Sequence, residues 1–283
     1  MKRRAAAGSV PKRTPVRVAR GRVPARRPTG DPDYMLSLAR GLSVSRACAD
    51  ARTPLSVAGV ARAAGLSRAA ARRCLYTLVQ LGYAASADGL FTLTPAVLTL
   101  GYAYLGSTSI ARVAQPVLER VSETLHESSS LAVLDGDEIV YLARAATRRI
   151  LSIGLSVGSR LPAACTSMGR VLLAALPPAP RSAVLARVKL VRHTPRTIVD
   201  RARLRAALDR VAGQGYAIVD QELELGLRSL AVPVRRTDGQ VVAAINVGVH
   251  AGRTDAATLE RDFLPVLRHA AAEIGEAIRH APA

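Results

Sequence analysis

The sequence predicts an α+β protein with two folded parts: a small helical head at residues 31–95 and a larger body of strands and helices at residues 128–283. Length is the first reason, since 283 residues exceed the usual size of one domain. Composition is the second, because 49% hydrophobic residues suffice for packed cores and exclude a wholly disordered chain. The third is pattern: apolar residues recur at helical spacing in the head, whereas the body combines strand-like runs with helices.

Residues 1–30 form a basic tail. They hold ten of the 40 lysines and arginines and no acidic residue, and so carry about half of the net charge of +19. Its prolines and lack of large apolar side chains predict disorder. They also exclude a secretory signal and disfavour an amphipathic transit helix. Two interpretations stay open: a polycation that binds DNA phosphates without reading sequence, or a solvated extension or misassigned start codon.

Composition excludes several other classes of protein. The three cysteines, Cys48, Cys74 and Cys165, are too widely spaced for a disulfide scaffold or a CxxC metal site, and fit a reducing cytoplasm. Cys165 is expected to be a small buried filler. The absence of tryptophan and the scarcity of other aromatic residues disfavour binding of single strands by base stacking. The uncharged stretch 89–111 is too rich in hydroxyl groups to span a membrane, so no membrane partner is expected.

Three helices are expected in the head. Leu38 and Leu42, and then Val44 and Cys48, are each four residues apart, and this spacing predicts the first. Ser56 is a natural N-cap for a short second helix and Ser67 for a third, and Gly65 supplies the turn between them. This order is typical of a helix-turn-helix, in which the third helix enters the major groove by its first turns.

A hairpin is expected directly after the third helix, because Asp88-Gly89 separates two short apolar runs. A hairpin at this place forms the wing of a winged helix-turn-helix, whose tip follows phosphates or the minor groove. Arginines on the third helix can bind guanine or phosphate; the alternative is a helical bundle with a solvated arginine face. The expected DNA-binding residues are Ser56, Ser67, Arg68, Ala69, Arg72, Arg73 and Tyr76.

Residues 96–127 are expected to form linker helices, with helical patterns at 95–104 and 110–126. The second pattern carries an apolar stripe, which Pro116 is expected to kink or offset. Such a stripe serves to pair two chains or to pack on its own body domain, and it can also do both. The stripe comprises Ile110, Val113, Val117, Val121 and Leu125.

The body shows strands and helices in an order that indicates a ligand-sensing α+β domain rather than alternating βαβ units. A hairpin through Asp135-Gly136-Asp137 joins the first two strands, and a turn at 237–240 joins the last two. Strands are expected at 130–134, 138–143, 149–157, 216–220, 229–234 and 241–249, and helices at 166–176, 181–187, 202–214 and 256–279.

The residues give no support for catalysis, a metal or a cofactor. None of the five histidines has ligand spacing to another histidine, a cysteine or a carboxylate, and no Gly-x-Ser-x-Gly elbow or phosphate-cradling glycine loop is present. Asp220, Glu222 and Glu224 alternate at an expected strand end. They are expected to face solvent or an arginine rather than a metal.

Three body segments resemble IclR-type transcriptional regulators: GSRLPAACTSMGR from residue 158, DQELELGLRS from 220 and AAINVG from 243. The resemblance covers about residues 34–280 and favours the branch that controls protocatechuate and 4-hydroxybenzoate catabolism, the PcaR/PcaU/PobR group. It implies a winged-helix head, a GAF-like effector-binding domain and dimers that often pair into tetramers. Members of this branch are mostly activators of aromatic-acid operons. The tail departs from the family in length and charge, so nothing is carried over to it.

The resemblance also implies the partners. These are double-stranded DNA with a pseudo-palindromic promoter site, a small aromatic carboxylate, a second or further copy of the chain and, for an activator, RNA polymerase. The alternatives are a repressor that responds to another small organic acid, or a GAF-like binding protein or enzyme without DNA binding.

Some residues of the expected effector site are predicted from their chemistry and others from the family resemblance. Arg160 is a candidate fork for the carboxylate, and Thr166 and Ser167 open a helix whose free amides attract anions. Alternatively, Arg160 pairs with Asp220 or Glu222, Asn246 caps hydrogen bonds at a sheet edge, and the two hydroxyls only cap the helix. By resemblance, the remaining lining residues are Ala163, Ala164, Asp220, Ser229, Asn246 and Gly248.

Overall fold

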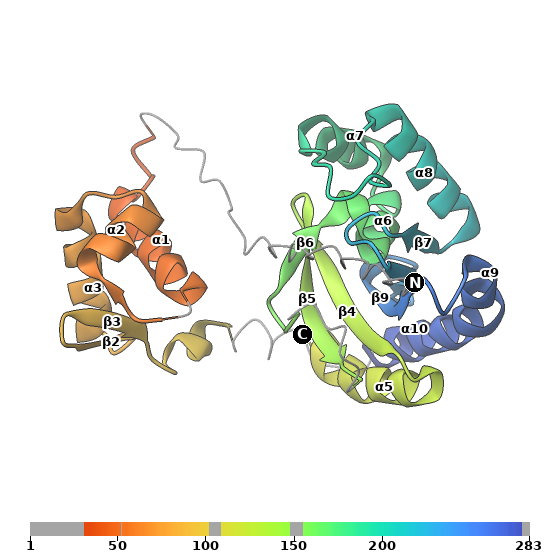
Figure 1. Ribbon diagram of the computed structural model, residues 1–283, viewed down its shortest axis with the longest axis horizontal. Coiled ribbons are helices and arrows are strands. Elements are labelled where there is room, and N and C mark those ends of the chain that lie inside the picture. The colour runs from red at the N-terminus through yellow and green to blue at the C-terminus, as the bar shows by residue number, and fades with distance from the viewer. Residues whose placement is uncertain (1–30, 52, 102–108, 148–154, 279–283) are drawn as a thin grey trace, which may run out of the picture. The chain divides into compact units, whose positions relative to one another are not determined.

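The computed structural model describes residues 31–51, 53–101, 109–147 and 155–278 (Figure 1). The basic tail at 1–30, part of the linker and most of the strand expected at 149–157 lie outside the described residues. The chain divides into two compact units, and the division falls between Ala114 and Gln115. We call residues 31–114 the helix-turn-helix unit and residues 115–276 the sensor unit. The expected linker boundaries at 96 and 127 stay a prediction.

Three helices form the helix-turn-helix unit around a small core in which Val44, Val60 and Leu75 are fully buried. The predicted caps are confirmed: the hydroxyl oxygens of Ser56 and Ser67 each accept a backbone N–H at 3.2 Å. Gly65 ends the second helix at φ +66°, a left-handed conformation that favours glycine. The helices are α1 Leu36–Asp50, α2 Val57–Ala64 and α3 Arg68–Gln80.

The predicted wing is present as strands β2 (Ala84–Ala87) and β3 (Leu90–Leu93). Asp88 and Gly89 between them both have positive φ, as a two-residue type I′ turn requires. A short strand before α2, β1 (Leu55–Ser56), pairs with β3 and completes a three-stranded sheet. Two residues carry no periodicity, so the sequence could not reveal this strand.

A short helical segment at 97–101 follows the wing, and residues 102–108 lie outside the described part of the chain. Helix α5 (Ser109–Leu125) then continues through Pro116. Within the sensor unit, the apolar stripe packs on its own domain: Val117 and Val121 are buried, and the hydroxyl of Ser129 donates to the Leu118 carbonyl at 2.7 Å. Pairing of two chains through the stripe stays a prediction.

The sensor unit is built on one six-stranded antiparallel sheet in the order β6-β5-β4-β9-β8-β7. The two predicted hairpins supply its four central strands, while β6 is a strand that the sequence pattern did not reveal. Residues 155–157, expected to be in a strand, are not. The strands are β4 Ser128–Asp135, β5 Glu138–Ala145, β6 Arg160–Pro162, β7 Ala217–Asp220, β8 Leu227–Arg235 and β9 Val241–His250.

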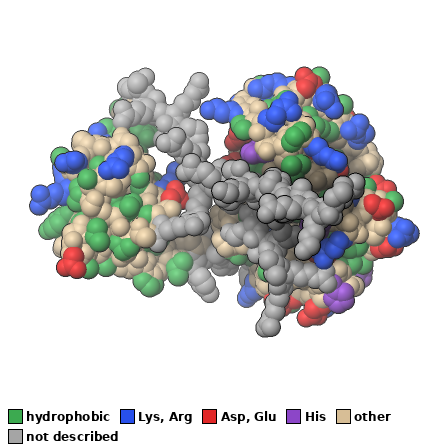
Figure 2. All heavy atoms as spheres, in the orientation of Figure 1, with side chains coloured by type: hydrophobic (Ala, Val, Ile, Leu, Met, Phe, Trp, Pro, Cys, Tyr) green, Lys and Arg blue, Asp and Glu red, His purple; other side chains and the backbone are tan. Residues whose placement is uncertain are grey.

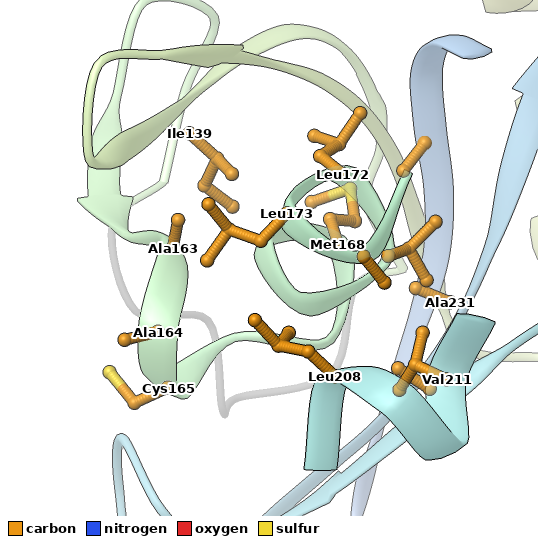
Figure 3. Close-up of a cluster of buried hydrophobic side chains, with 14 of the residues drawn as sticks. Ile139, Ala163, Ala164, Cys165, Met168, Leu172, Leu173, Leu208, Val211 and Ala231 are labelled. Atoms are coloured by element: carbon orange, nitrogen blue, oxygen red, sulfur yellow. The ribbon is translucent and has the colours of Figure 1, made fainter. Parts of the chain in front are cut away.

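Helices cover both faces of this sheet (Figure 1). Helix α6 (Ser167–Ala174) packs on one face against β8 and β9 and is covered by α8 (Arg201–Gln214), with α7 (Pro178–Arg187) beside them. On the opposite face lie α5 and α10 (Leu264–Ile278), where Gly275 packs against the Arg235 carbonyl. Figure 3 shows the apolar cluster around α6, which includes Ile139, Met168, Leu172, Leu173, Leu208, Val211 and Ala231. None of the described helices is long and apolar enough to cross a membrane.

The terminal helix is not continuous as predicted. A short helix α9 (Ala256–Thr258) passes through a π-helical turn at Leu259–Phe263 into α10. Pro265 lies at the second position of α10. It has no N–H, and in a regular α-helix its ring would clash with the carbonyl of Arg261. The wider turn before it avoids this clash.

We expect Gly169→Ala to destabilise the sensor unit, because a Cβ atom at Gly169 would lie 2.2 Å from the Ala163 carbonyl oxygen. Overpacking of this kind costs about 1–3 kcal/mol. The matched control is Gly213→Ala, in α8, where a Cβ atom meets nothing within 4 Å. This control should stabilise the helix by about 0.5–1 kcal/mol. Urea unfolding of both variants measures the two effects, and equal midpoints would contradict the close packing.

Candidate nucleic-acid interface and effector site

The outer face of α3 carries three arginines without internal partners among the described residues. Arg68, Arg72 and Arg73 are exposed, and their guanidinium groups form neither an ion pair nor a hydrogen bond with any described residue. Tyr76, on the same helix, is 65% exposed, and Ala69 near the N-terminus leaves the backbone accessible. The opposite face holds the buried Ala71 and Leu75. Figure 2 shows lysine and arginine side chains on the surface of this unit.

Ser56 and Ser67 serve α2 and α3 as caps and are themselves exposed. Each hydroxyl oxygen accepts a backbone N–H, which leaves its own O–H free to donate. At the N-terminal ends of two helices, such donors add to a local positive potential that suits phosphate oxygens. Of the seven residues predicted to contact DNA, Ser56 therefore caps α2, Ser67 caps α3, and the other five lie on α3.

The wing, whose tip was expected to follow phosphates or the minor groove, carries no basic residue. Residues 81–96 contain no lysine or arginine, and the exposed tip carries Asp88. A carboxylate at the tip repels phosphate, so we expect the strong phosphate contacts to come from α3 rather than from the wing.

Arg160 does not pair with Asp220 or Glu222, so that alternative is wrong. Its Nε donates to Glu138 Oε2 at 2.8 Å and its Nη2 to Asp135 Oδ2 at 2.6 Å. Both carboxylates flank the turn between β4 and β5, so the guanidinium ties the edge strand β6 to that hairpin. An effector carboxylate would have to compete with two acids already in place. The predicted role of Arg160 as the effector's carboxylate fork therefore finds no support in this geometry.

Asp220 and Glu222 each have an arginine partner, as predicted in preference to a metal. Asp220 Oδ1 accepts from Arg228 Nε at 2.9 Å, and Arg196 approaches its other oxygen. Partial burial acts to raise the pKa of Asp220, but the hydrogen bonds and charges of these arginines hold it below its usual range. Glu222 is buried and accepts from Arg170 Nη2 at 2.7 Å.

The segment before α6 is almost fully buried. Ala163 and Ala164 belong to the apolar cluster. Thr166 caps α6, since its hydroxyl accepts from the Gly169 amide at 3.3 Å and donates to the Pro162 carbonyl at 3.0 Å. Ser167 is different: it is 1% exposed and its Oγ has no hydrogen-bond partner. The capping alternative therefore holds for Thr166 but not for Ser167.

Asn246 and Gly248 are not at a sheet edge but in the central strand β9. Asn246 lies between Ser130 of β4 and Ala231 of β8, and Gly248 lies opposite Ser229 of β8. Because Ala231 belongs to the apolar cluster around α6, this face of the sheet is the one that α6 covers. The Oδ1 atom of Asn246 is buried and has no hydrogen-bond partner, so the predicted edge-capping role is wrong.

Arg144 is a candidate site residue that sequence reasoning missed. On β4, Ser130 and Ala132 share a face, and they lie opposite Arg144 and Tyr141 of β5. A regular strand would turn residues 141 and 144 to opposite faces, but a register shift at this point inserts one extra residue. The bulge therefore directs Arg144 toward α6. An arginine within an otherwise apolar strand was a visible signal, whereas the bulge that orients it has no local signature.

The guanidinium of Arg144 has no carboxylate partner among the described residues. Its one hydrogen bond joins Nη1 to Ser130 Oγ at 3.4 Å. Burial lowers the pKa of Arg144, and the same burial raises the pKa of the neighbouring Tyr141 to about 12. Arg144, Ser130 and Asn246 are thus cross-strand neighbours on the face of the sheet covered by α6.

Two family models match the chain. The IclR helix-turn-helix domain matches residues 37–87, and the bacterial transcriptional regulator IclR C-terminal domain matches residues 102–276. The chain belongs to the IclR family. It is 50% identical over 247 residues to the Pca regulon regulatory protein of Pseudomonas putida, with 87% of this chain and 85% of that protein covered. It is 37% identical to the p-hydroxybenzoate hydroxylase transcriptional activator of Acinetobacter baylyi, over 86% of this chain and 91% of that protein.

Solved structures agree with this assignment. A transcriptional regulator from Rhodococcus sp. RHA1 superposes with a TM-score of 0.77 at 48% identity, over 87% of this chain and 99% of that one. An IclR homologue from Microbacterium hydrocarbonoxydans, complexed with 4-hydroxybenzoate, gives 0.76 at 29% identity, over 87% and 100%. The predicted family and branch are confirmed. The protein is a DNA-binding transcriptional regulator of the Pca/PobR type and not an enzyme.

We expect Glu222→Gln to weaken the sensor unit strongly, because it leaves the buried charge of Arg170 without its counter-ion. Removing one partner of a buried pair costs about 3–5 kcal/mol. The control is Asp209→Asn, which breaks the exposed pair of Asp209 with Arg181 and should cost less than about 1 kcal/mol. Denaturant unfolding measures both. Similar losses of unfolding free energy in the two variants would contradict a larger contribution from the buried pair.

Cys165 should be inert toward thiol reagents in the native protein. Burial raises its pKa to about 12, and the negative charge of Glu222 adds to the shift. The thiolate, which is the reactive form, is therefore scarce at pH 8. Mass spectrometry after brief treatment with iodoacetamide should find label on Cys48 or Cys74 well before Cys165. Labelling of Cys165 as fast as in the unfolded chain would contradict this prediction.

Proposed function

We propose that this protein activates an aromatic-acid catabolic operon in response to a small aromatic carboxylate such as protocatechuate or 4-hydroxybenzoate. It binds a pseudo-palindromic promoter site as a homodimer or homotetramer, with Arg68, Arg72 and Arg73 as its main DNA contacts. The observation that carries the proposal is the serine-capped α3, which presents arginines without internal partners. Such a helix supplies both phosphate and guanine contacts.

The effector class is supported by relatives and by chemistry. A related solved structure holds 4-hydroxybenzoate, and another relative is named an activator of p-hydroxybenzoate hydroxylase transcription. The sensor unit offers what an aromatic acid needs, namely a cation without a carboxylate partner beside apolar side chains.

The proposal is tested by a transcription reporter fused to a promoter fragment that the protein itself selects from genomic DNA. Addition of 4-hydroxybenzoate or protocatechuate should raise the output severalfold in the presence of the protein and leave it unchanged in its absence. Lower output on addition of the acid would contradict activation. No response to any aromatic acid would contradict the effector class.

Arg72→Ala should weaken binding to the selected duplex about tenfold at physiological salt, because a good arginine contact with a base contributes about 1–3 kcal/mol. If Arg72 contacts phosphate instead, the slope of log K against log salt should fall by about 0.9. The matched control is Arg46→Ala, an exposed arginine on α1, which should leave affinity and slope unchanged. A mobility shift over a range of salt concentrations decides, and an Arg72→Ala variant indistinguishable from the control would remove this residue from the interface.

A further inference from the structure

Arg144 differs from the other described arginines of the sensor unit that are buried or half-buried. The other described arginines that are buried or half-buried there each have a carboxylate within 3.3 Å: Arg160 with Asp135 and Glu138, Arg170 with Glu222, Arg181 with Asp209, and Arg228 with Asp220. Among the residues that the structure describes, the guanidinium of Arg144 hydrogen-bonds only to the hydroxyl of Ser130. Taking a cation out of water without an anion is costly, so this position is best explained by an anion that comes from a ligand.

The second feature is an unsatisfied acceptor on β9, two strands away from β5 in the sheet. Asn246 Oδ1 is buried and unpartnered, and an amide oxygen can only accept hydrogen bonds. Ser130 lies directly opposite both Arg144 and Asn246, so the two residues are separated by two strand spacings of about 4.8 Å each. Since the Arg144 side chain reaches over Ser130, one small molecule can contact both groups.

The two features together define the ligand more closely than either alone. An inorganic anion such as sulfate would satisfy the guanidinium but would leave the Asn246 oxygen without a donor. A carboxylic acid without a hydroxyl group would do the same. A molecule with a carboxylate and a separate O–H group satisfies both. On α6, which packs on this face of the sheet, Ser167 Oγ is a further buried group without a hydrogen-bond partner.

We propose that Arg144 binds the carboxylate of the effector and that Asn246 selects effectors that also carry a hydroxyl group. The proposal rests on the proposed function, since it refines how the same sensor unit recognises its aromatic acid. It replaces Arg160 by Arg144 as the anion-binding residue. Discrimination by a buried acceptor is steep, because a ligand without the donor leaves that acceptor unpaired.

The experiment is isothermal titration calorimetry of the full-length protein with 4-hydroxybenzoate, protocatechuate and benzoate. The variants are Arg144→Gln, Arg144→Lys, Asn246→Ala and Arg160→Gln, with Arg181→Gln as the control because it removes another half-buried arginine of the same unit. Circular dichroism confirms that each variant is folded. For Asn246→Ala, the ratio of affinities for the hydroxylated acid and for benzoate is measured on the same preparation, so it does not depend on stability.

The wild type should bind a hydroxylated acid at least tenfold more tightly than benzoate. Arg144→Gln should weaken every acid at least tenfold, Arg144→Lys should recover part of the loss, and Arg181→Gln should match the wild type. In Asn246→Ala, the preference for the hydroxylated acid should fall below threefold while benzoate still binds.

Each assignment can be overturned by its own result. Wild-type affinity in Arg144→Gln, or the main loss in Arg160→Gln, would refute the role of Arg144. An unchanged preference in Asn246→Ala would refute the role of Asn246. A wild-type protein that binds the selected promoter but none of the acids would refute the effector class of the proposed function itself.

Discussion

The arrangement of the sensor unit depends on the free-energy cost of removing a charged side chain from water. Arg170 and Glu222 meet in its interior and join α6 to the segment after β7, and Glu222 also accepts the Ile198 amide at 3.0 Å. Arg160 joins β6 to the hairpin of β4 and β5 in the same way. Each pair connects segments that are distant in the chain, so the charges fix the arrangement of the sheet and α6. Against this background, an arginine without an acid marks where a ligand completes the structure.

In the helix-turn-helix unit, the arginines of α3 need no internal partner because they are not removed from water. The arginines of α3 lie in water, where an unpaired guanidinium carries no desolvation cost. They can therefore stay free until DNA phosphate or guanine replaces their hydration. The small core beneath them, centred on Val44, Val60 and Leu75, holds α3 in place without using any polar group of its outer face. Recognition and folding are thus assigned to opposite sides of one helix.

The sequence was most informative where structure is decided locally. Serine caps, Gly65 and the Asp88-Gly89 turn act within three or four residues, so their patterns predicted the helix-turn-helix and its wing. Pairing between distant segments has no such signature: the partners of Arg160 lie more than twenty residues away, and β1 needs β3 to exist at all. The bulge in β5 and the π-helical turn before α10 change direction or pitch by a single residue. Periodicity averaged over a window does not resolve them.

The central claim is that Arg144, which has no carboxylate partner among the described residues, binds the carboxylate of the effector. A crystal structure of the full-length protein with 4-hydroxybenzoate tests this claim most directly. The account predicts the effector carboxylate within about 2.9 Å of the Arg144 guanidinium, with Arg160 still bound to Asp135 and Glu138. A carboxylate seated on Arg160 with those two acids displaced, while Arg144 stays without an anion, would contradict it.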